Sequence, residues 1–254
     1  MAERITSRTN PLMTHIRKLA SSRSHRYETG EFLGDGTKLL EEAARWGAAL
    51  TAAVYTPGTA LPPLPEGVRL VEVPADVMRS ISPMEAPQGA LFLARIPAQT
   101  LPDTLPGGRY LALEGVQDPG NVGTILRTAD AFGADGLILL PGCADLYSHK
   151  TVRSSMGAVF RLPVYEGALD RAAELLSQAG VPLYAAALRE DTVDVRAARL
   201  DGAAVVIGSE GRGVSRRALE LCQKTVKIPM RARCESLNAA VAAAVVLWEM
   251  ARGD

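Results

Sequence analysis

Five polar side chains stand where the sequence predicts the ends of buried strands, and their types could hold a polar ligand. An amide and a guanidinium lie six residues apart in NVGTILRTADAFG, a carboxylate lies within VVIGSEGRGVS, and a hydroxyl and a second amide lie within ESLNAAVA. Amides and hydroxyls bind ligands by hydrogen bonds, whereas a guanidinium stays protonated and stabilises negative charge. These residues are Asn121, Arg127, Glu210, Ser236 and Asn238.

The second half of the chain contains the elements that would position these side chains. Apolar runs predict strands over residues 109–115, 136–142, 159–165, 182–188, 203–211 and 225–229. Between them, and at the C-terminus, the pattern predicts helices over 121–133, 148–156, 168–179, 214–222 and 236–252. Near-continuous apolar strands that alternate with helices are typical of a parallel sheet covered on both faces. Ligands of such sheets bind beyond the carboxyl ends of the strands, where the polar residues occur.

The glycine-rich stretch around Glu210 fits a particular kind of ligand. Glycines 208, 211 and 213 permit positive φ and close approach of a ligand to the backbone. The spacing is neither that of a dinucleotide-binding turn nor that of a triphosphate-binding loop, and a central carboxylate would repel a pyrophosphate. The stretch therefore favours a cationic or neutral ligand, although a plain tight turn is the alternative. Capping is likewise the alternative for Ser236, which is a natural N-cap of the last helix.

Composition and charge limit the class of protein. With 254 residues and 47% hydrophobic residues, the chain is long and apolar enough for two packed domains. Equal numbers of basic and acidic residues, 28 each, do not indicate a nucleic-acid binder as a whole. The N-terminal segment is locally basic, however, which indicates either a solvated surface or contact with phosphates. Its basic residues are Arg4, Arg8, Arg17, Lys18, Arg23 and Arg26.

Cysteine usage and hydropathy indicate in which cellular compartment we expect the protein. Cys143, Cys222 and Cys234 are scattered, so we expect no disulfide framework and no metal site, as in the reducing cytoplasm. The longest apolar run, residues 239–248, is too short to span a bilayer, so we expect no membrane association.

The first half reads as a small α/β unit. Asn10 and Thr14 could cap a helix that carries Ile16 and Leu19, and residues 36–48 predict a second helix. The strand candidates are residues 30–34, 50–55, 68–73 and 89–94. The proline-rich stretch 95–108 separates the halves, which predicts domains over 1–97 and 109–254 with a linker over 98–108.

The three polar motifs, in this order and spacing, resemble the signature motifs of the SpoU (TrmH-like) family of RNA 2′-O-ribose methyltransferases. The segment SHKTVRSSMGAVFRLPV also resembles the stretch that the family has between its first two motifs. The first half is more weakly similar to a small RNA-binding domain related to certain ribosomal proteins. The stretch GEFLGDGTKLLEEA stands where the family pattern has an apolar and an acidic residue before the glycine, and Gly34 and Asp35 depart from that pattern.

The resemblance implies a trefoil-knotted α/β methyltransferase domain that binds S-adenosylmethionine. It implies that Arg127 is the catalytic arginine, which we interpret as a phosphate clamp that also stabilises oxyanion charge, because a guanidinium is a poor base. Asn121 would hold this arginine or the ribose, and Glu210 would orient the neighbouring loop or pair with a basic group. Ser236 and Asn238 would complete the site. The implied cofactor-binding residues are Ala187, Leu188, Gly208, Ile228, Met230, Ser236 and Leu237.

The resemblance also implies partners. The substrate would be RNA, with ribosomal RNA favoured over transfer RNA, and the chain would form a homodimer to which the alanine-rich last helix contributes. The basic N-terminal residues and Arg127 would contact the RNA, and no metal is expected. The main alternative is a ribosome-assembly or RNA-binding protein with the same fold and no transferase activity. A nicotinamide-dependent oxidoreductase is a weaker alternative, because the chain lacks a GxGxxG turn.

Overall fold

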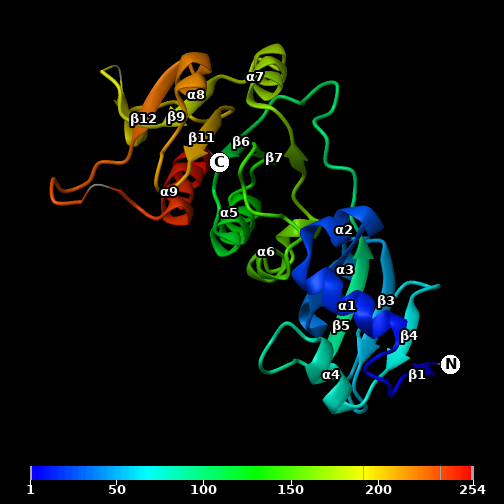
Figure 1. Ribbon diagram of the computed structural model, residues 1–254. Coiled ribbons are helices and arrows are strands. Elements are labelled where there is room, and N and C mark those ends of the chain that lie inside the picture. The colour runs from blue at the N-terminus through cyan, green and yellow to red at the C-terminus, as the bar shows by residue number, and fades with distance from the viewer. Residues whose placement is uncertain (1, 191, 235, 253–254) are drawn as a thin grey trace. The chain divides into compact units, whose positions relative to one another are not determined.

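The computed structural model describes residues 2–190, 192–234 and 236–252, and it shows an α/β protein with two compact units (Figure 1). The first unit contains the residues up to Ala98 together with Asp145–Phe160. The second contains Gln99–Ala144 and the residues from Arg161 onward. Among the described residues we find no helix with the length and hydropathy that a bilayer-spanning segment needs.

The first unit has a mixed five-stranded sheet of order β1-β4-β3-β5-β2. Its strands are β1 (Glu3–Arg4), β2 (Glu31–Asp35), β3 (Leu50–Tyr55), β4 (Arg69–Glu72) and β5 (Ala90–Arg95). β5 runs antiparallel to both neighbours, whereas β1, β4 and β3 are mutually parallel. Its helices are α1 (Pro11–Ser21), α2 (Arg23–Thr29), α3 (Thr37–Arg45), α4 (Ala75–Ile81) and α6 (His149–Ser154).

Local sequence signals account for the first helix and the second strand. The Asn10 side chain accepts a hydrogen bond from the Leu12 amide, so the predicted cap of α1 is confirmed, and Ile16 and Leu19 are buried. Gly34 is the fourth of the five residues of β2, and a Cβ atom there would come within 2.1 Å of the Phe92 ring. The departure from the family pattern at this position therefore has a steric reason. The sequence did not predict β1, α2 or α4, which are short.

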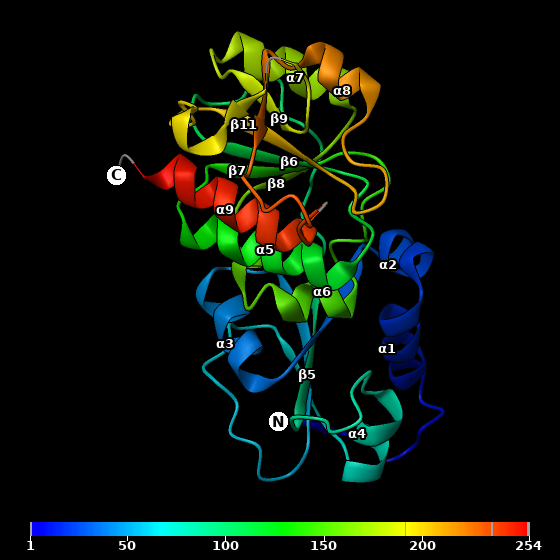
Figure 2. The same cartoon turned by 90° about the vertical axis from the view of Figure 1, so that its left-hand side faces the viewer.

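The second unit has an entirely parallel seven-stranded sheet of order β10-β12-β9-β11-β6-β7-β8. Helices α5 and α9 cover one face and α7 and α8 the other, which confirms the predicted doubly covered sheet (Figure 2). The strands are β6 (Tyr110–Glu114), β7 (Gly136–Leu139), β8 (Val164–Glu166), β9 (Leu183–Ala186), β10 (Val193–Asp194), β11 (Ala204–Gly208) and β12 (Lys224–Lys227). The helices are α5 (Pro119–Ala131), α7 (Leu169–Gln178), α8 (Arg216–Leu221) and α9 (Ala239–Ala251). The trefoil knot stays a prediction.

The segment Asp145–Phe160 packs with the first unit, although it connects β7 to β8 of the second unit's sheet. The sequence assigned it to the second domain and predicted a strand over 159–165. That strand prediction is wrong at its start, because residues 158–160 form a 3-10 turn and the strand begins at Val164. The Phe160 ring lies 6.3 Å from the Phe32 ring, and the Tyr147 ring lies 4.7 Å from it, so aromatic contacts within the first unit hold the segment.

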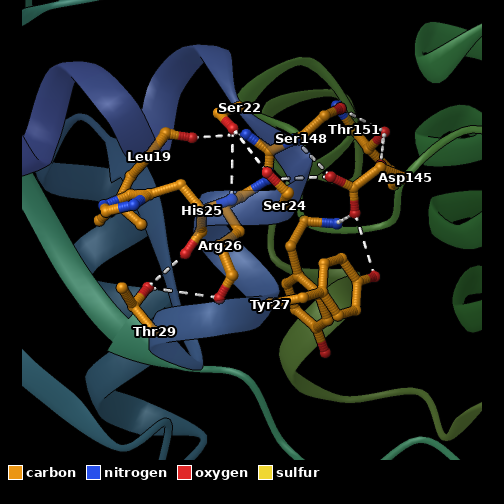
Figure 3. Close-up of polar contacts among 11 residues, drawn as sticks. Leu19, Ser22, Ser24, His25, Arg26, Tyr27, Thr29, Asp145, Ser148 and Thr151 are labelled. Carbon is orange, nitrogen blue, oxygen red and sulfur yellow. Dashed lines mark hydrogen bonds and ion pairs between the residues drawn. The ribbon is translucent and has the colours of Figure 1, made fainter.

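A buried ion pair holds the same segment (Figure 3). The Arg26 guanidinium donates to Asp145 Oδ2 from Nη2 at 2.5 Å and from Nε at 2.9 Å, and its Nη1 donates to the Leu19 carbonyl. The Tyr27 hydroxyl donates to the other carboxylate oxygen of Asp145 at 3.2 Å. The two charged side chains are only 5% and 8% exposed. Such a pair is costly to break, because the remaining charge would be buried without a partner.

Candidate functional site

Asn121 is positioned by the start of α5, directly beyond the carboxyl end of β6. Asp118 is the N-cap and its Oδ1 accepts from the Asn121 amide at 2.8 Å, while Pro119 occupies the first turn. The Asn121 side chain donates from Nδ2 to Glu210 Oε1 at 2.6 Å. Its Oδ1 accepts from Asn238 Nδ2 at 3.1 Å. Three strand-end motifs, far apart in the sequence, therefore meet in one hydrogen-bonded chain.

Asn238 fixes the direction of this chain of hydrogen bonds. Its Oδ1 accepts from the amides of Ala240 and Val241, at 2.9 and 3.3 Å, so it is the N-cap of α9. The expectation that Ser236 caps this helix is wrong, because the helix begins at Ala239 and the cap falls on the residue before it. Because Asn238 Oδ1 accepts from the helix, Asn238 Nδ2 is the group that donates to Asn121. Asn121 accepts this bond with its Oδ1, so its own Nδ2 is left to donate to Glu210.

A cavity of about 330 Å³ lies beside this chain of hydrogen bonds, at the ends of β9, β11 and β12. Glu210, the glycine backbone of the 208–213 loop and several apolar side chains line it. All seven residues that the resemblance implied as cofactor-binding are among its walls: Ala187, Leu188, Gly208, Ile228, Met230, Ser236 and Leu237. Three of them, Leu188, Met230 and Leu237, expose large apolar side chains, at 78%, 43% and 37%.

A second cavity, of about 540 Å³, is lined in part by the same loop. Ser209, Glu210 and Gly213 line both cavities, so this loop is their common wall. The larger cavity adds polar residues that the sequence analysis did not single out: Glu114, Gln117, Arg212 and Ser215. Glu114 and Gln117 could have been found, because Glu114 is the last residue of β6 and Gln117 lies three residues beyond it, where ligands of a parallel sheet bind.

Gly208 is required by the fold of this loop. Residues 209–213 turn back through a hydrogen bond from the Gly213 amide to the Ser209 carbonyl at 2.9 Å. A Cβ atom on residue 208 would lie 2.1 Å from the carbonyl carbon of Gly213 and 2.4 Å from the Val214 nitrogen. Because those atoms belong to the backbone, no side-chain rotation could relieve the clash.

We therefore expect Gly208→Ala to disturb the loop that both cavities share. The expected result is a loss of affinity for S-adenosylmethionine of at least about tenfold. The reason is that the backbone of the 208–213 loop, which lines the cavity, would have to move. Isothermal titration calorimetry of the two proteins measures it. Gly211→Ala is the matched control, because a Cβ atom there meets nothing within 4 Å. Equal affinities of the wild type and Gly208→Ala would show that the loop does not form the binding wall.

Arg127 is placed differently from the other predicted catalytic residues. It is exposed on α5, and like Asn121 and Asn238 it lines neither cavity, but it does not take part in their hydrogen bonds. At 1.5 Å per residue, it lies roughly 9 Å further along the helix axis than Asn121. Among the described residues we find no hydrogen bond or ion pair to its guanidinium, so Asn121 does not hold this arginine, and only the ribose is left of the two partners expected for it.

The basic N-terminal residues differ in whether their side chains are exposed and could contact RNA. Arg26 cannot contact RNA as expected, because its guanidinium is buried against Asp145, which corrects that expectation. Arg4 and Arg8 are exposed but pair with Glu72 and Asp76. Arg17 donates to the Arg8 carbonyl at 2.8 Å, whereas Lys18 and Arg23 are exposed. Within the described part of the chain, no group of three or more His, Cys, Asp or Glu side chains is arranged to hold a metal ion.

Comparisons with known proteins point to one family. The model of the SpoU rRNA Methylase family matches residues 108–248, and that of an MRM3-like substrate binding domain matches residues 10–91. The chain is 31% identical to the 23S rRNA (guanosine(2553)-2'-O)-methyltransferase RlmP of Bacillus subtilis, over 98% of this chain and 99% of that protein. It is 32% identical to the 23S rRNA (uridine(2479)-2'-O)-methyltransferase of Streptomyces viridochromogenes, over 99% and 92%.

Solved structures agree with this. An AdoMet-bound rRNA methyltransferase from Sinorhizobium meliloti superposes with a TM-score of 0.88 at 31% identity, covering 99% of this chain and 98% of that one. The SpoU methyltransferase AviRb from Streptomyces viridochromogenes, in complex with AdoMet, has a TM-score of 0.83 at 29% identity, covering 96% and 98%.

Proposed function

Because the chain belongs to the SpoU rRNA methylase family, we propose that it transfers a methyl group from S-adenosylmethionine to a ribose 2′-hydroxyl of ribosomal RNA. The observation that carries the proposal is the hydrogen-bonded chain Glu210–Asn121–Asn238 at the edge of the smaller cavity. A protein that only binds RNA has no need of this arrangement beside a small-molecule cavity.

The smaller cavity fits S-adenosylmethionine by its size and its chemistry. Its volume of about 330 Å³ is in the range of small-ligand sites, and the apolar side chains of Leu188, Met230 and Leu237 suit an adenine ring. The Gly208 backbone allows close approach, and the Glu210 carboxylate at the wall favours a positively charged ligand. When bound, the cofactor supplies an activated methyl group on a sulfonium.

The protein's own side chains then orient the acceptor. Methyl transfer needs the 2′-hydroxyl in line with the methyl carbon, and positioning contributes much of the rate. Asn121 donates a hydrogen bond to Glu210, which restrains the loop that lines both cavities, and we place the ribose beside this loop. Arg127 clamps a phosphate of the RNA and stabilises the charge that develops on the 2′-oxygen. The proton passes to a phosphate or to water, since the guanidinium already carries its own.

The α5–α9 face supports a homodimer. Trp248 and Val241 on α9 are 58% and 50% exposed, and the Trp248 ring contacts Phe132 at 5.6 Å. An apolar face of this kind marks an interaction surface. Arg127, which is exposed on α5, would then lie at the interface, where a site shared by two copies could use it.

Light scattering should give twice the monomer mass for the wild type, and the Trp248→Glu variant should give the monomer mass. A monomeric wild type at micromolar concentration would contradict the dimer.

Mapping of ribose methylation tests the function and the choice of RNA. RNA from cells with and without this protein should differ at a ribosomal position, in keeping with a cytoplasmic enzyme. If only transfer RNA differed in its methylation, transfer RNA and not ribosomal RNA would be the substrate. If no RNA differed and calorimetry showed no binding of the cofactor, a non-catalytic RNA-binding protein would be favoured.

A further inference from the structure

A third cavity, of about 310 Å³, is lined by residues of the first unit, whereas the two cavities described above are lined by residues of the second. We call it the α3 cavity. It lies between the end of β2, the first turns of α3, the segment just before β5 and the end of α6. Its walls are Asp35, Lys38, Leu39, Glu42, Gln88, Arg153 and Met156.

Two of these walls come from the segment that the buried ion pair holds. Arg153 and Met156 belong to Asp145–Phe160, which the Arg26–Asp145 pair and the Phe32–Phe160 contact fix to the first unit. Met156 has a φ of 50°, and it is the one non-glycine residue with positive φ in the described part of the chain. This conformation is unfavourable for methionine, and its side chain is 53% exposed. The cavity is therefore complete only when this segment is in place.

The shape of the cavity also depends on a glycine. Gly36 precedes α3 with a φ of 95°, and a Cβ atom there would lie 2.4 Å from Gln88 Oε1. The absence of a side chain at residue 36 thus lets the Gln88 amide lie directly against the backbone. An alanine would displace this amide from the cavity wall.

The polar groups of the cavity include both acceptors and donors. Asp35 Oδ2 accepts from the Ser82 hydroxyl at 3.2 Å, and we find no partner for its Oδ1 among the described residues. Burial raises the pKa of Asp35, while the Ser82 hydrogen bond and the Arg153 charge lower it. Lys38 and Arg153 add exposed cations, and Leu39 and Met156 add apolar surface. Such a site suits a flat ligand with hydrogen-bond donors on one edge and acceptors on the other.

We propose that the α3 cavity binds an unpaired guanine of the substrate RNA. Guanine presents adjacent N–H donors for a carboxylate on one edge and the O6 and N7 acceptors for a guanidinium or ammonium on another. Proteins recognise sequence in RNA mostly at such unstacked bases. The proposal rests on the proposed function, because it takes RNA as the ligand of the first unit.

Binding of fluorescein-labelled single-stranded RNA dodecamers to the full chain tests the proposal, without S-adenosylmethionine. One dodecamer contains adenosine only, a second has one central guanosine, and a third has inosine there, which lacks the 2-amino group. We expect the guanosine to strengthen binding about tenfold over adenosine, and inosine to lose part of this gain. Asp35→Asn should bind all three RNAs equally.

Two further variants keep the test decisive. Arg153→Ala removes an exposed side chain and should also abolish the preference for guanosine, whereas Glu66→Gln, an exposed carboxylate outside the cavity, should keep it. Equal binding of the three RNAs by the wild type, no binding of any, or a preference that survives in Asp35→Asn would each overturn the proposal. Because no methyl transfer is measured, these outcomes are independent of the methylation assay that tests the proposed function.

Discussion

Replacement of Arg127 by alanine is expected to reduce methyl transfer to ribosomal RNA by at least about 10²–10³-fold, the range found when a charge-stabilising group is removed. The affinity for S-adenosylmethionine should be nearly unchanged, because Arg127 does not line the smaller cavity. The stability should also be kept, since the side chain is exposed on α5. Single-turnover transfer from labelled S-adenosylmethionine and calorimetry of cofactor binding measure the two quantities.

Two variants control this experiment. Arg199→Ala removes another exposed arginine of the second unit and should leave transfer unchanged. Arg127→Lys keeps the charge and loses the planar fork, so it should retain a small part of the activity if phosphate clamping needs two parallel hydrogen bonds. A parallel loss of cofactor affinity in Arg127→Ala would mean that this residue has been assigned the wrong role.

Removal of the carboxylate from the buried ion pair should cost the first unit much of its stability. Asp145→Ala leaves the Arg26 guanidinium buried with the Leu19 carbonyl as its remaining hydrogen-bond partner. Breaking a buried pair in this way typically costs about 3–5 kcal/mol in the free energy of unfolding. Urea unfolding followed by the fluorescence of Trp46, in a Trp248→Phe background, reports the first unit, because these are the two tryptophans of the chain.

The matched controls separate burial from charge pairing. Asp76→Ala breaks the exposed Arg8–Asp76 pair, at 2.8 Å, and should have a much smaller effect, because solvent screens exposed pairs. The double variant Arg26→Met with Asp145→Ala should recover most of the loss, since no charge is then left buried. If Asp145→Ala were as stable as Asp76→Ala, the ion pair would not be what holds the segment.

Much of the candidate site could be predicted from the sequence, because a change from apolar to polar residues marks the end of a strand. Asn121, Glu210 and Asn238 could be grouped in advance, since each follows such a change and parallel strands end at one edge. Their mutual hydrogen bonds could not be predicted, because they depend on which of two neighbouring residues, Ser236 or Asn238, caps α9.

Other features of the fold depend on contacts between distant parts of the chain, which local sequence patterns do not predict. Arg26 was assigned to RNA by counting charges, but its partner Asp145 lies 119 residues away. The helix over 148–156 was predicted from its pattern, although nothing in the pattern shows that it packs on the first unit. Short elements such as β1 depend on pairing with β4, which the two residues themselves do not reveal.

The excursion of Asp145–Phe160 out of the second unit has a consequence for synthesis and for protein engineering. The chain passes between the units at residues 98/99, 144/145 and 160/161, so the N-terminal unit cannot finish folding on the ribosome until β6, α5 and β7 have already emerged. A chimera that exchanges only the first 98 residues would separate Arg26 from Asp145 and Phe32 from Phe160. Grafting a new RNA specificity onto this enzyme therefore requires the transfer of both pieces together.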